Sequence, residues 1–147
     1  DAPLRAPMSW TGDIKGFSTG LAFRPVSPNA ASHNAAFEQG DPASLLSFYK
    51  AMLRLRNDDP SLAQGSYEAA TVNGALFSFQ RRYGRQLSVV VINYGSSQSQ
   101  LQLSGLPPNS RLQANYPAQA KPVRSDRKGR LSLSLPGQSV AVYTVHP

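Results

Sequence analysis

The sequence lacks cysteine and is poor in acidic residues. Its 147 residues include no Cys, which excludes disulfides, thiolate metal sites and a cysteine nucleophile. No apolar run approaches the length of a membrane span, so we expect no membrane partner. Asp and Glu number 8 against 15 Lys and Arg, which leaves a net charge of +7. Such a surplus attracts polyanions at low salt, but alone it identifies no partner.

Motifs that carry chemistry are also missing. There is no glycine-rich phosphate loop, no histidine pair at helical spacing and no calcium-loop pattern. His33 and His146 stand apart and favour solvent-facing or structural roles. The adjacent carboxylates Asp58 and Asp59 precede Pro60, which favours a solvated turn over an acid–base pair. We therefore predict no catalytic residue and no metal ligand in this chain.

Residues 1–40 are rich in Pro, Gly, Asn, Ser and Ala and show neither helical nor strand periodicity. About forty such residues exceed an ordinary loop, and a loop of this length packs on another part of a structure or carries function. Large apolar side chains argue against disorder. These side chains are Trp10, Phe17, Phe23 and Phe37.

A helix is predicted over about residues 42–56. Asp41 is suited to cap it, and Pro42 fits a first turn that needs no amide donor. The apolar positions Leu45, Phe48, Tyr49 and Met52 recur at helical spacing, widened by Leu46, Leu53 and Leu55. The helix should end before Pro60, because proline disfavours a helical residue before it.

From Ser66 onward, short strands alternate with turn signals. The predicted strands are 67–72, 75–81, 86–94, 99–103, 111–115, 130–135 and 139–145. Asn73-Gly74 is a strong hairpin signal between the first two. The third strand is apolar on both faces and should be central, whereas residues 131–135 alternate Leu with Ser and should have one buried face. The spacing predicts an antiparallel β-sandwich.

The stretch 121–130 carries five cationic residues against one acidic residue. The cations are Lys121, Arg124, Arg127, Lys128 and Arg130. A polyanion patch is one interpretation. A mobile charged hairpin is favoured, because no aromatic residue is interleaved to stack on nucleic-acid bases. We therefore expect no nucleic-acid partner.

The first third of the chain resembles a known family. Residues 4–10 (LRAPMSW), 16–17 and 23–29 (FRPVSPN) resemble a segment that follows the seventh barrel strand in the α-glucosidase branch of glycoside hydrolase family 13, the α-amylase family. Ala6 and Ser9 depart from the Thr and Gln more common there. Residues 41–49 (DPASLLSFY) resemble the last barrel helix, and residues 135–143 resemble the final strand of the family's C-terminal domain.

The resemblance implies an α+β fragment. It divides the chain at residues 1–64, the irregular loop and last helix of a (β/α)₈ barrel, and 65–147, an antiparallel β-sandwich C-terminal domain. The complete enzyme would be a retaining glycoside hydrolase of the α-glucosidase or α-amylase type. An isomerising or transglycosylating relative such as a trehalose synthase is the alternative.

The family's catalytic Asp, Glu and second Asp lie on barrel strands that precede this segment. Retaining chemistry needs two carboxyl groups flanking the glycosidic bond, and none of the eight acidic residues lies in a matching motif. We therefore expect the chain alone to be inactive. No cofactor is implied for it, while calcium in the missing part stays open.

Arg5 is the position that the resemblance carries over as substrate-binding. In exo-acting relatives this arginine lines the pocket for the terminal glucose, where its planar donors can bind sugar hydroxyls. A structural arginine that ties the loop to the barrel is the alternative. The implied substrate is an α-linked glucoside or maltooligosaccharide.

The resemblance also predicts a partner. The apolar stripe of helix 42–56 should pack on barrel strands outside this sequence, so we expect a companion chain carrying the barrel or self-association through the helix face. Because the first residue is Asp, we expect a nicked, split or trimmed product; periplasmic, secreted and cytoplasmic locations all stay open.

Two other hypotheses remain. A free-standing carbohydrate-binding β module would need exposed coplanar aromatics, for which Tyr67, Tyr83, Tyr94 and Tyr116 are candidates. A basic nucleic-acid-binding β domain is supported by charge alone.

Overall fold

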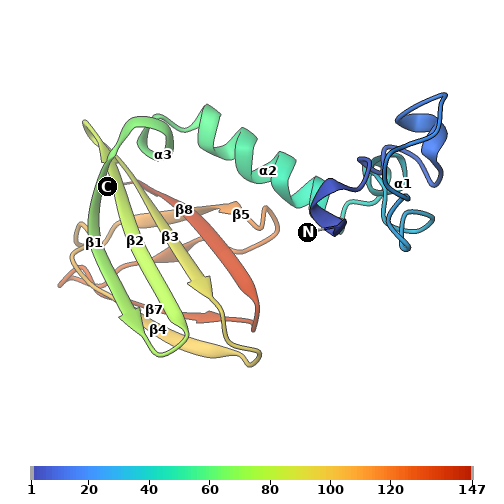
Figure 1. The fold of residues 1–147 in the computed structure, drawn as a ribbon. Helices are drawn as coiled ribbons and strands as arrows, with labels where there is room; N and C mark the ends of the chain where they lie inside the picture. Colours follow the sequence, from blue (N-terminus) through green and yellow to red (C-terminus); the bar gives the residue numbers. More distant parts are fainter. Residues whose placement is uncertain (1, 147) are drawn as a thin grey trace. The chain divides into compact units, whose positions relative to one another are not determined.

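The computed structural model describes residues 2–146, with side chains from Leu4 onward. It divides into two compact units, one up to Arg54 and one from Leu55 onward. We call them the N-terminal unit and the β unit (Figure 1). No helix among the described residues is long and apolar enough to cross a membrane.

The N-terminal unit is mostly irregular. Its regular elements are η1 (Ala2–Arg5), η2 (Ile14–Gly16), α1 (Ala35–Gln39) and the first part of α2 (Leu45–Asp58). The short helix α1 is not predicted from periodicity, because five residues are too few to show it. Asn34 caps α1 by accepting a hydrogen bond from the backbone N–H of Phe37 at 2.9 Å.

Helix α2 begins three residues later than the sequence predicts. Ser44 caps it, because its Oγ accepts from the N–H of Ser47 at 3.1 Å. Asp41 is therefore not the cap, and its carboxylate accepts from a backbone N–H in the preceding turn at 2.8 Å. Glu38 also reaches the first turn of α2, where it accepts from the N–H of Leu46 at 3.0 Å. A carboxylate there complements the positive end of the helix dipole.

The apolar stripe of α2 is not covered by the described residues. No residue of α2 is buried, and Leu45, Tyr49 and Leu53 are 64%, 57% and 56% exposed. We call these three residues the exposed stripe. A row of large apolar side chains in water is a surface suited to contact another molecule or segment.

A second short helix, α3 (Pro60–Gln64), precedes the strands and packs against the sheet. Asp59 is its N-cap and Pro60 its first residue. An Asp-Pro pair is the helix-start signal that we used at Asp41-Pro42. The same signal occurs at Asp59-Pro60, where a solvated turn was predicted. The turn prediction is therefore wrong for Asp59, which is buried.

The β unit contains eight strands in two antiparallel sheets. They are β1 (Ser66–Asn73), β2 (Leu76–Tyr83), β3 (Gln86–Asn93), β4 (Ser99–Leu103), β5 (Arg111–Tyr116), β6 (Val123–Arg124), β7 (Leu131–Leu135) and β8 (Ser139–His146). The larger sheet has the order β1-β2-β3-β8-β5-β6, and β4 pairs with β7 in the smaller one (Figure 1). Only the two-residue strand β6 is absent from the predicted set.

One hydrophobic core joins the two sheets. It contains Leu76, Leu87, Val89, Val91, Leu101, Leu103, Leu106, Leu112, Ala114, Leu131, Leu133, Leu135, Ala141, Tyr143 and Val145. The prediction that β3 is central and buried on both faces is confirmed, because residues 87–91 are all buried and β3 lies between β2 and β8. The single buried face predicted for residues 131–135 is confirmed as well.

Candidate functional site

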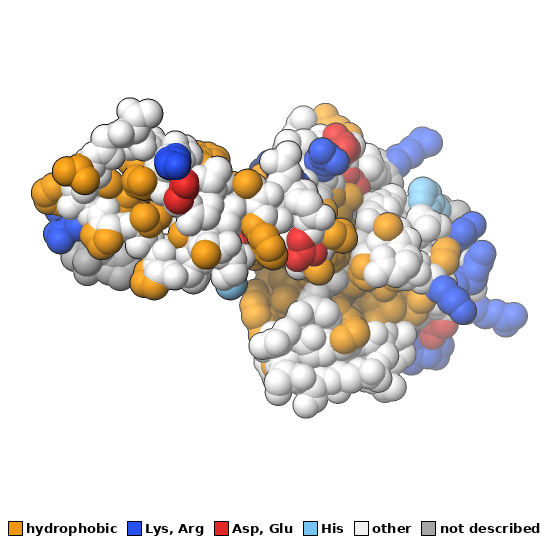
Figure 2. Space-filling view, turned by 90° about the vertical axis from the view of Figure 1, so that its right-hand side faces the viewer, with side chains coloured by type: hydrophobic (Ala, Val, Ile, Leu, Met, Phe, Trp, Pro, Cys, Tyr) orange, Lys and Arg blue, Asp and Glu red, His pale blue; other side chains and the backbone are white. Residues whose placement is uncertain are grey.

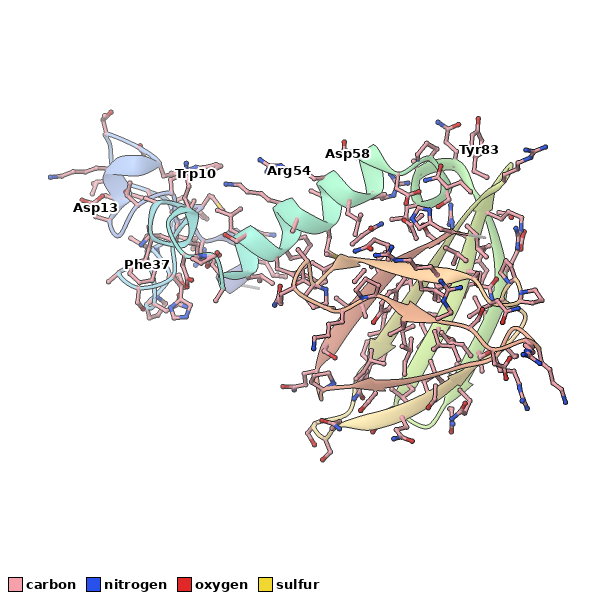
Figure 3. All side chains as sticks on the ribbon, turned by 180° about the vertical axis from the view of Figure 1, so that it is seen from behind. Trp10, Asp13, Phe37, Arg54, Asp58 and Tyr83 are labelled. Atoms are coloured by element: carbon pink, nitrogen blue, oxygen red, sulfur yellow. The ribbon has the colours of Figure 1, made fainter. Side chains whose placement is uncertain are left out.

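Among residues 2–146, no group of three or more His, Cys, Asp or Glu side chains could hold a metal ion. The adjacent carboxylates Asp58 and Asp59 do not work as a pair. Asp58 is exposed on α2 (Figure 3), whereas Asp59 is 6% exposed.

Asp59 is the centre of a buried polar network in the β unit. Its Oδ1 accepts from the N–H of Ser61 at 2.8 Å and from Nε2 of Gln86 at 3.0 Å. The hydroxyl of Ser61 lies 2.6 Å from the same oxygen. Its Oδ2 accepts from Ser88 Oγ at 2.9 Å and from Thr144 Oγ1 at 3.4 Å. One carboxylate therefore connects the start of α3 to β3 and β8.

The network keeps Asp59 ionised. Burial raises the pKa of its carboxyl, but hydrogen bonds from Ser61 and Ser88 outweigh that effect and hold the pKa below its ordinary value. With both oxygens occupied by donors, this carboxylate is structural rather than an acid or base.

The N-terminal unit contains a cavity beside the family-like motif. Its volume is about 380 Å³. It is lined by Ala6, Pro7, Met8, Ser9, Ser27, His33, Asn34, Ala35, Glu38 and Leu46. Four of these residues are consecutive in the motif at positions 4–10, so the motif forms one wall.

Backbone hydrogen bonds hold this wall against α1. The carbonyl of Ser9 accepts from the N–H of Ala35 at 2.9 Å, and that of Trp10 accepts from Ala36 at 3.0 Å. Asn34 adds a buried contact, since its Nδ2 donates to the Ala30 carbonyl at 2.7 Å. These bonds satisfy polar groups that a long irregular loop would otherwise leave unpaired.

Arg5 lies immediately before the cavity wall. It is the last residue of η1, and its side chain is exposed rather than among the groups that line the cavity. His33, predicted to be isolated, lies in the lining, with Nδ1 at 2.9 Å from Ser32 Oγ. Arg5 is therefore adjacent in sequence to Ala6, the first residue that lines the cavity.

The aromatic residues of this unit are not packed into a core. Trp10, Phe17 and Phe37 are at least half exposed, and Phe23 is 87% exposed. Figure 3 shows Trp10 and Phe37 in the N-terminal unit. An irregular segment with uncovered aromatic rings is suited to contact further structure.

Arg24 has a donor with no acceptor among the described residues. Its guanidinium lies 5.1 Å from the ring centroid of Phe23, and its Nε is buried without a hydrogen-bond partner there. A buried donor without a hydrogen-bond partner costs about 1–3 kcal/mol of stability, so such groups are rare in native proteins. The FRPV sequence signals a loop, but no sequence pattern could reveal this unpaired donor.

The four candidate tyrosines differ in exposure. Tyr67, Tyr83 and Tyr94 are exposed, while Tyr116 is half-buried. Tyr67 packs on Phe79 at 5.1 Å between centroids with a 37° tilt. Sugar-binding surfaces in modules of this kind need coplanar exposed rings, and Tyr116 is not an exposed ring.

Comparison with known proteins identifies relatives for most of the chain. Residues 1–65 match the model of the α-amylase catalytic domain. A probable α-glucosidase of Rhizobium meliloti is 33% identical over 90 residues, which cover 60% of this chain and 16% of the relative. A probable oligo-1,6-glucosidase of Bacillus subtilis is 33% identical over 100 residues, which cover 67% of this chain and 18% of the relative.

Solved structures resemble nearly the full chain. The trehalulose synthase of Pseudomonas mesoacidophila matches 97% of it with a TM-score of 0.77 and 28% identity. The isomaltulose synthase of a Klebsiella species matches 97% with a TM-score of 0.76 and 26% identity. The match covers 25% of each of those chains. Residues 1–65 therefore resemble the catalytic domain of the α-amylase family, and the chain spans a quarter or less of the length of these relatives.

Proposed function

We propose that this chain is the C-terminal part of a retaining enzyme that acts on α-linked glucosides. It completes the substrate pocket and supports the fold, while the catalytic carboxylates lie in a part outside this chain. The observation that carries the proposal is the match of residues 1–65 to the α-amylase catalytic domain.

In this proposal, residues 1–64 are the end of a (β/α)₈ barrel and residues 65–147 are its C-terminal β-sandwich domain. Three features of the N-terminal unit support the division. Its aromatic side chains are uncovered, the exposed stripe of α2 faces water, and the buried Nε of Arg24 lacks an acceptor. Barrel strands packed on this unit would cover the first two and supply an acceptor for the third.

The substrate pocket includes Arg5 in this proposal. Arg5 ends η1 and directly precedes the cavity wall. Its exposed guanidinium can present planar donors to the hydroxyls of a terminal glucose. The carboxylates of the missing part would form and break a glycosyl–enzyme bond on one side of the sugar.

Hydrolysis is the proposed reaction, since the curated relatives are named as α-glucosidases and oligo-1,6-glucosidases. Rearrangement of a disaccharide is the second candidate. The solved structures that match 97% of this chain are trehalulose and isomaltulose synthases. The two reactions differ in the acceptor, water or a sugar hydroxyl, that attacks the glycosyl–enzyme.

The remainder of the barrel is the proposed partner of the exposed stripe, carried by a companion chain. Self-association through the same stripe is the alternative. Three large apolar residues of α2 that are more than half exposed support either arrangement.

Native mass spectrometry of the purified material, beside an assay on a chromogenic α-glucoside, tests the proposal. We expect an active complex larger than the 15.9 kDa chain. A lone 15.9 kDa species that binds maltooligosaccharides without cleaving them contradicts the enzyme proposal and favours a binding module.

Within an active complex, Arg5→Ala tests the pocket. We expect a higher KM and a kcat/KM lower by about tenfold or more, the loss of about 1.4 kcal/mol. Lys15→Ala removes an exposed cation from the same unit and should change neither value. Equal losses from both variants would mean that Arg5 has no special contact with substrate.

A further inference from the structure

The net positive charge is confined to one part of the chain. Residues 1–65 contain six Lys and Arg and six Asp and Glu, so they are balanced. Residues 66–147 contain nine cations, namely Arg81, Arg82, Arg85, Arg111, Lys121, Arg124, Arg127, Lys128 and Arg130, against Glu68 and Asp126. The whole surplus of +7 therefore lies on the strands and their connections, whereas the part that matches the catalytic domain is neutral.

Both acidic residues of this region are already paired. Glu68 Oε2 lies 3.2 Å from Arg82 Nε, and Asp126 Oδ2 lies 2.9 Å from Arg130 Nε. The other oxygen of Asp126 accepts from two backbone N–H groups in its turn, each at 2.8 Å. These bonds hold the pKa of Asp126 below its ordinary value, so its carboxylate is ionised and already paired. Among the described residues of this region, the other seven cations have no ion pair with Glu68 or Asp126.

Three of the basic side chains form a row across neighbouring strands. Arg124 of β6 lies opposite Arg111 of β5, which in turn lies opposite His146 of β8. Opposite residues project from the same face, and strands lie about 4.8 Å apart, so the row spans roughly 10 Å. All three residues are exposed. Like charges directly opposite are unfavourable, and a bound polyanion would remove that repulsion.

Neutral acceptors orient the two arginines without neutralising them. Arg124 Nη1 donates to the Asn109 carbonyl at 2.6 Å, and Arg111 Nη2 donates to Gln113 Oε1 at 3.1 Å. The remaining donors of each guanidinium fork are those that bind carboxylate, sulfate or phosphate oxygens in pairs. We call Arg111, Arg124, Arg127, Lys128 and Lys121 the cationic edge.

The five residues of the cationic edge are all exposed. Figure 2 shows Lys and Arg side chains gathered on one side of the β unit, with few acidic ones among them. The stretch 121–130, predicted to be a mobile hairpin, includes strand β6 paired to β5. Arg111 and Arg124 therefore lie on hydrogen-bonded strands, whereas Lys121, Arg127 and Lys128 lie in the connections beside them.

Two classes of polyanion do not fit this surface. Proteins that bind single-stranded nucleic acids use aromatic side chains that stack on the bases, and residues 117–142 contain no Phe, Tyr or Trp. Membrane surfaces are bound through cations together with inserted apolar side chains. Between residues 95 and 146, no large hydrophobic side chain is exposed. A polymer that carries acidic groups on sugars needs neither feature.

We propose that the cationic edge binds an acidic polysaccharide, a sugar polymer that carries carboxylate or sulfate groups. The binding is electrostatic and independent of the neutral glucoside proposed as substrate, so it does not rest on the proposed function. It would hold the protein on a charged polymer through the β unit.

Fluorescence anisotropy with labelled heparin, a sulfated polysaccharide, tests the proposal on the full chain. The variant R111Q/R124Q/K128Q removes three charges from the cationic edge. We expect it to weaken binding at low salt by about tenfold or more and to reduce the slope of log affinity against log salt by about two to three, since each neutralised charge contributes close to one.

The matched control is K50Q/R54Q/R56Q, which removes three exposed charges from α2. We expect it to change heparin affinity by less than about twofold beyond a small net-charge effect. Equal losses from the two triple variants would overturn the proposal, because they would mean that net charge alone drives binding. Thermal melts of both variants should match the unmodified chain.

Competing ligands decide the class of polymer. Polygalacturonate, a carboxylated polysaccharide, should displace labelled heparin, whereas neutral maltooligosaccharides should not. Single-stranded DNA or vesicles of anionic lipid that bind more tightly than heparin would overturn the proposal in favour of nucleic acid or membrane.

Discussion

The two units differ in how far each satisfies its own side chains. The β unit buries a continuous apolar core between two sheets and pairs its buried carboxylate with several donors. The N-terminal unit has short helices, uncovered aromatic rings and an unpaired buried donor at Arg24. Because apolar burial is the main favourable term in folding, the β unit should hold most of the chain's stability.

The largest effect should come from the β-unit core. Leu101 is 1% exposed, and Leu101→Ala leaves a cavity that should cost about 2–5 kcal/mol in the free energy of unfolding. Leu53→Ala makes the same chemical change on the exposed stripe and should cost less than about 0.5 kcal/mol beyond helix propensity. Urea denaturation monitored by circular dichroism checks both. Similar losses would contradict the contrast between the units.

The next effect compares two Asp-Pro pairs. Asp59→Ala removes the carboxylate that joins α3 to β3 and β8 and leaves buried hydroxyls unpaired, which should cost about 2–3 kcal/mol. Asp41→Ala removes an exposed carboxylate that accepts a hydrogen bond from the backbone N–H of Ala43 in its own turn, and it should cost about 0.5–1 kcal/mol. Thermal melts of both variants measure the difference. A smaller loss for Asp59 than for Asp41 would refute the network's structural role.

Acid should weaken the β unit through Asp59. Its pKa is lower in the folded protein than the 3.8 of the unfolded chain, so the unfolded state binds more protons as pH falls. The stabilisation is present above pH 3.8 and is lost as pH falls through the lower folded value. Urea midpoints measured between pH 6 and about pH 3 should decrease. Asp59→Asn should reduce that dependence, and an unchanged profile would exclude Asp59 as its source.

The smallest effect on stability should come from the exposed stripe. Tyr49→Ser with Leu53→Ser replaces two exposed apolar groups and should change the free energy of unfolding by less than about 1 kcal/mol. The same variant should reduce any complex formed through α2, which size-exclusion chromatography measures. Lys50→Ser is the control on the charged side. If the double variant leaves the complex intact, the stripe is not the contact surface.

The local pattern was sufficient for most strands and for α2 because each contains enough residues to show its period. The hairpin signal at Asn73-Gly74 also appears in the structure, where β1 and β2 pair antiparallel around Gly74 with a φ of +59°. Helices α1 and α3 and strand β6 are too short to show a period. Their positions depend on caps and on pairing with distant segments.

The candidate site was accessible to sequence only through its motif. The residues 4–10 that resemble the family form part of the cavity wall, yet Glu38 and Leu46 reach it only because α1 and α2 fold back. The role of Arg5 stays a prediction. The unpaired Nε of Arg24 depends on which atoms surround it, and local sequence carries no information about that.

The resemblance to the α-amylase family, the β-rich second half and the charge surplus can all be read from the sequence, because they follow from residue types and short spacings. Only the tertiary structure decided which Asp-Pro pair is buried, since Asp59 receives donors from Gln86, Ser88 and Thr144, which are distant in the chain. It also decided that Arg111, Arg124 and His146 form one row, because strand register, and not sequence spacing, sets which side chains are neighbours.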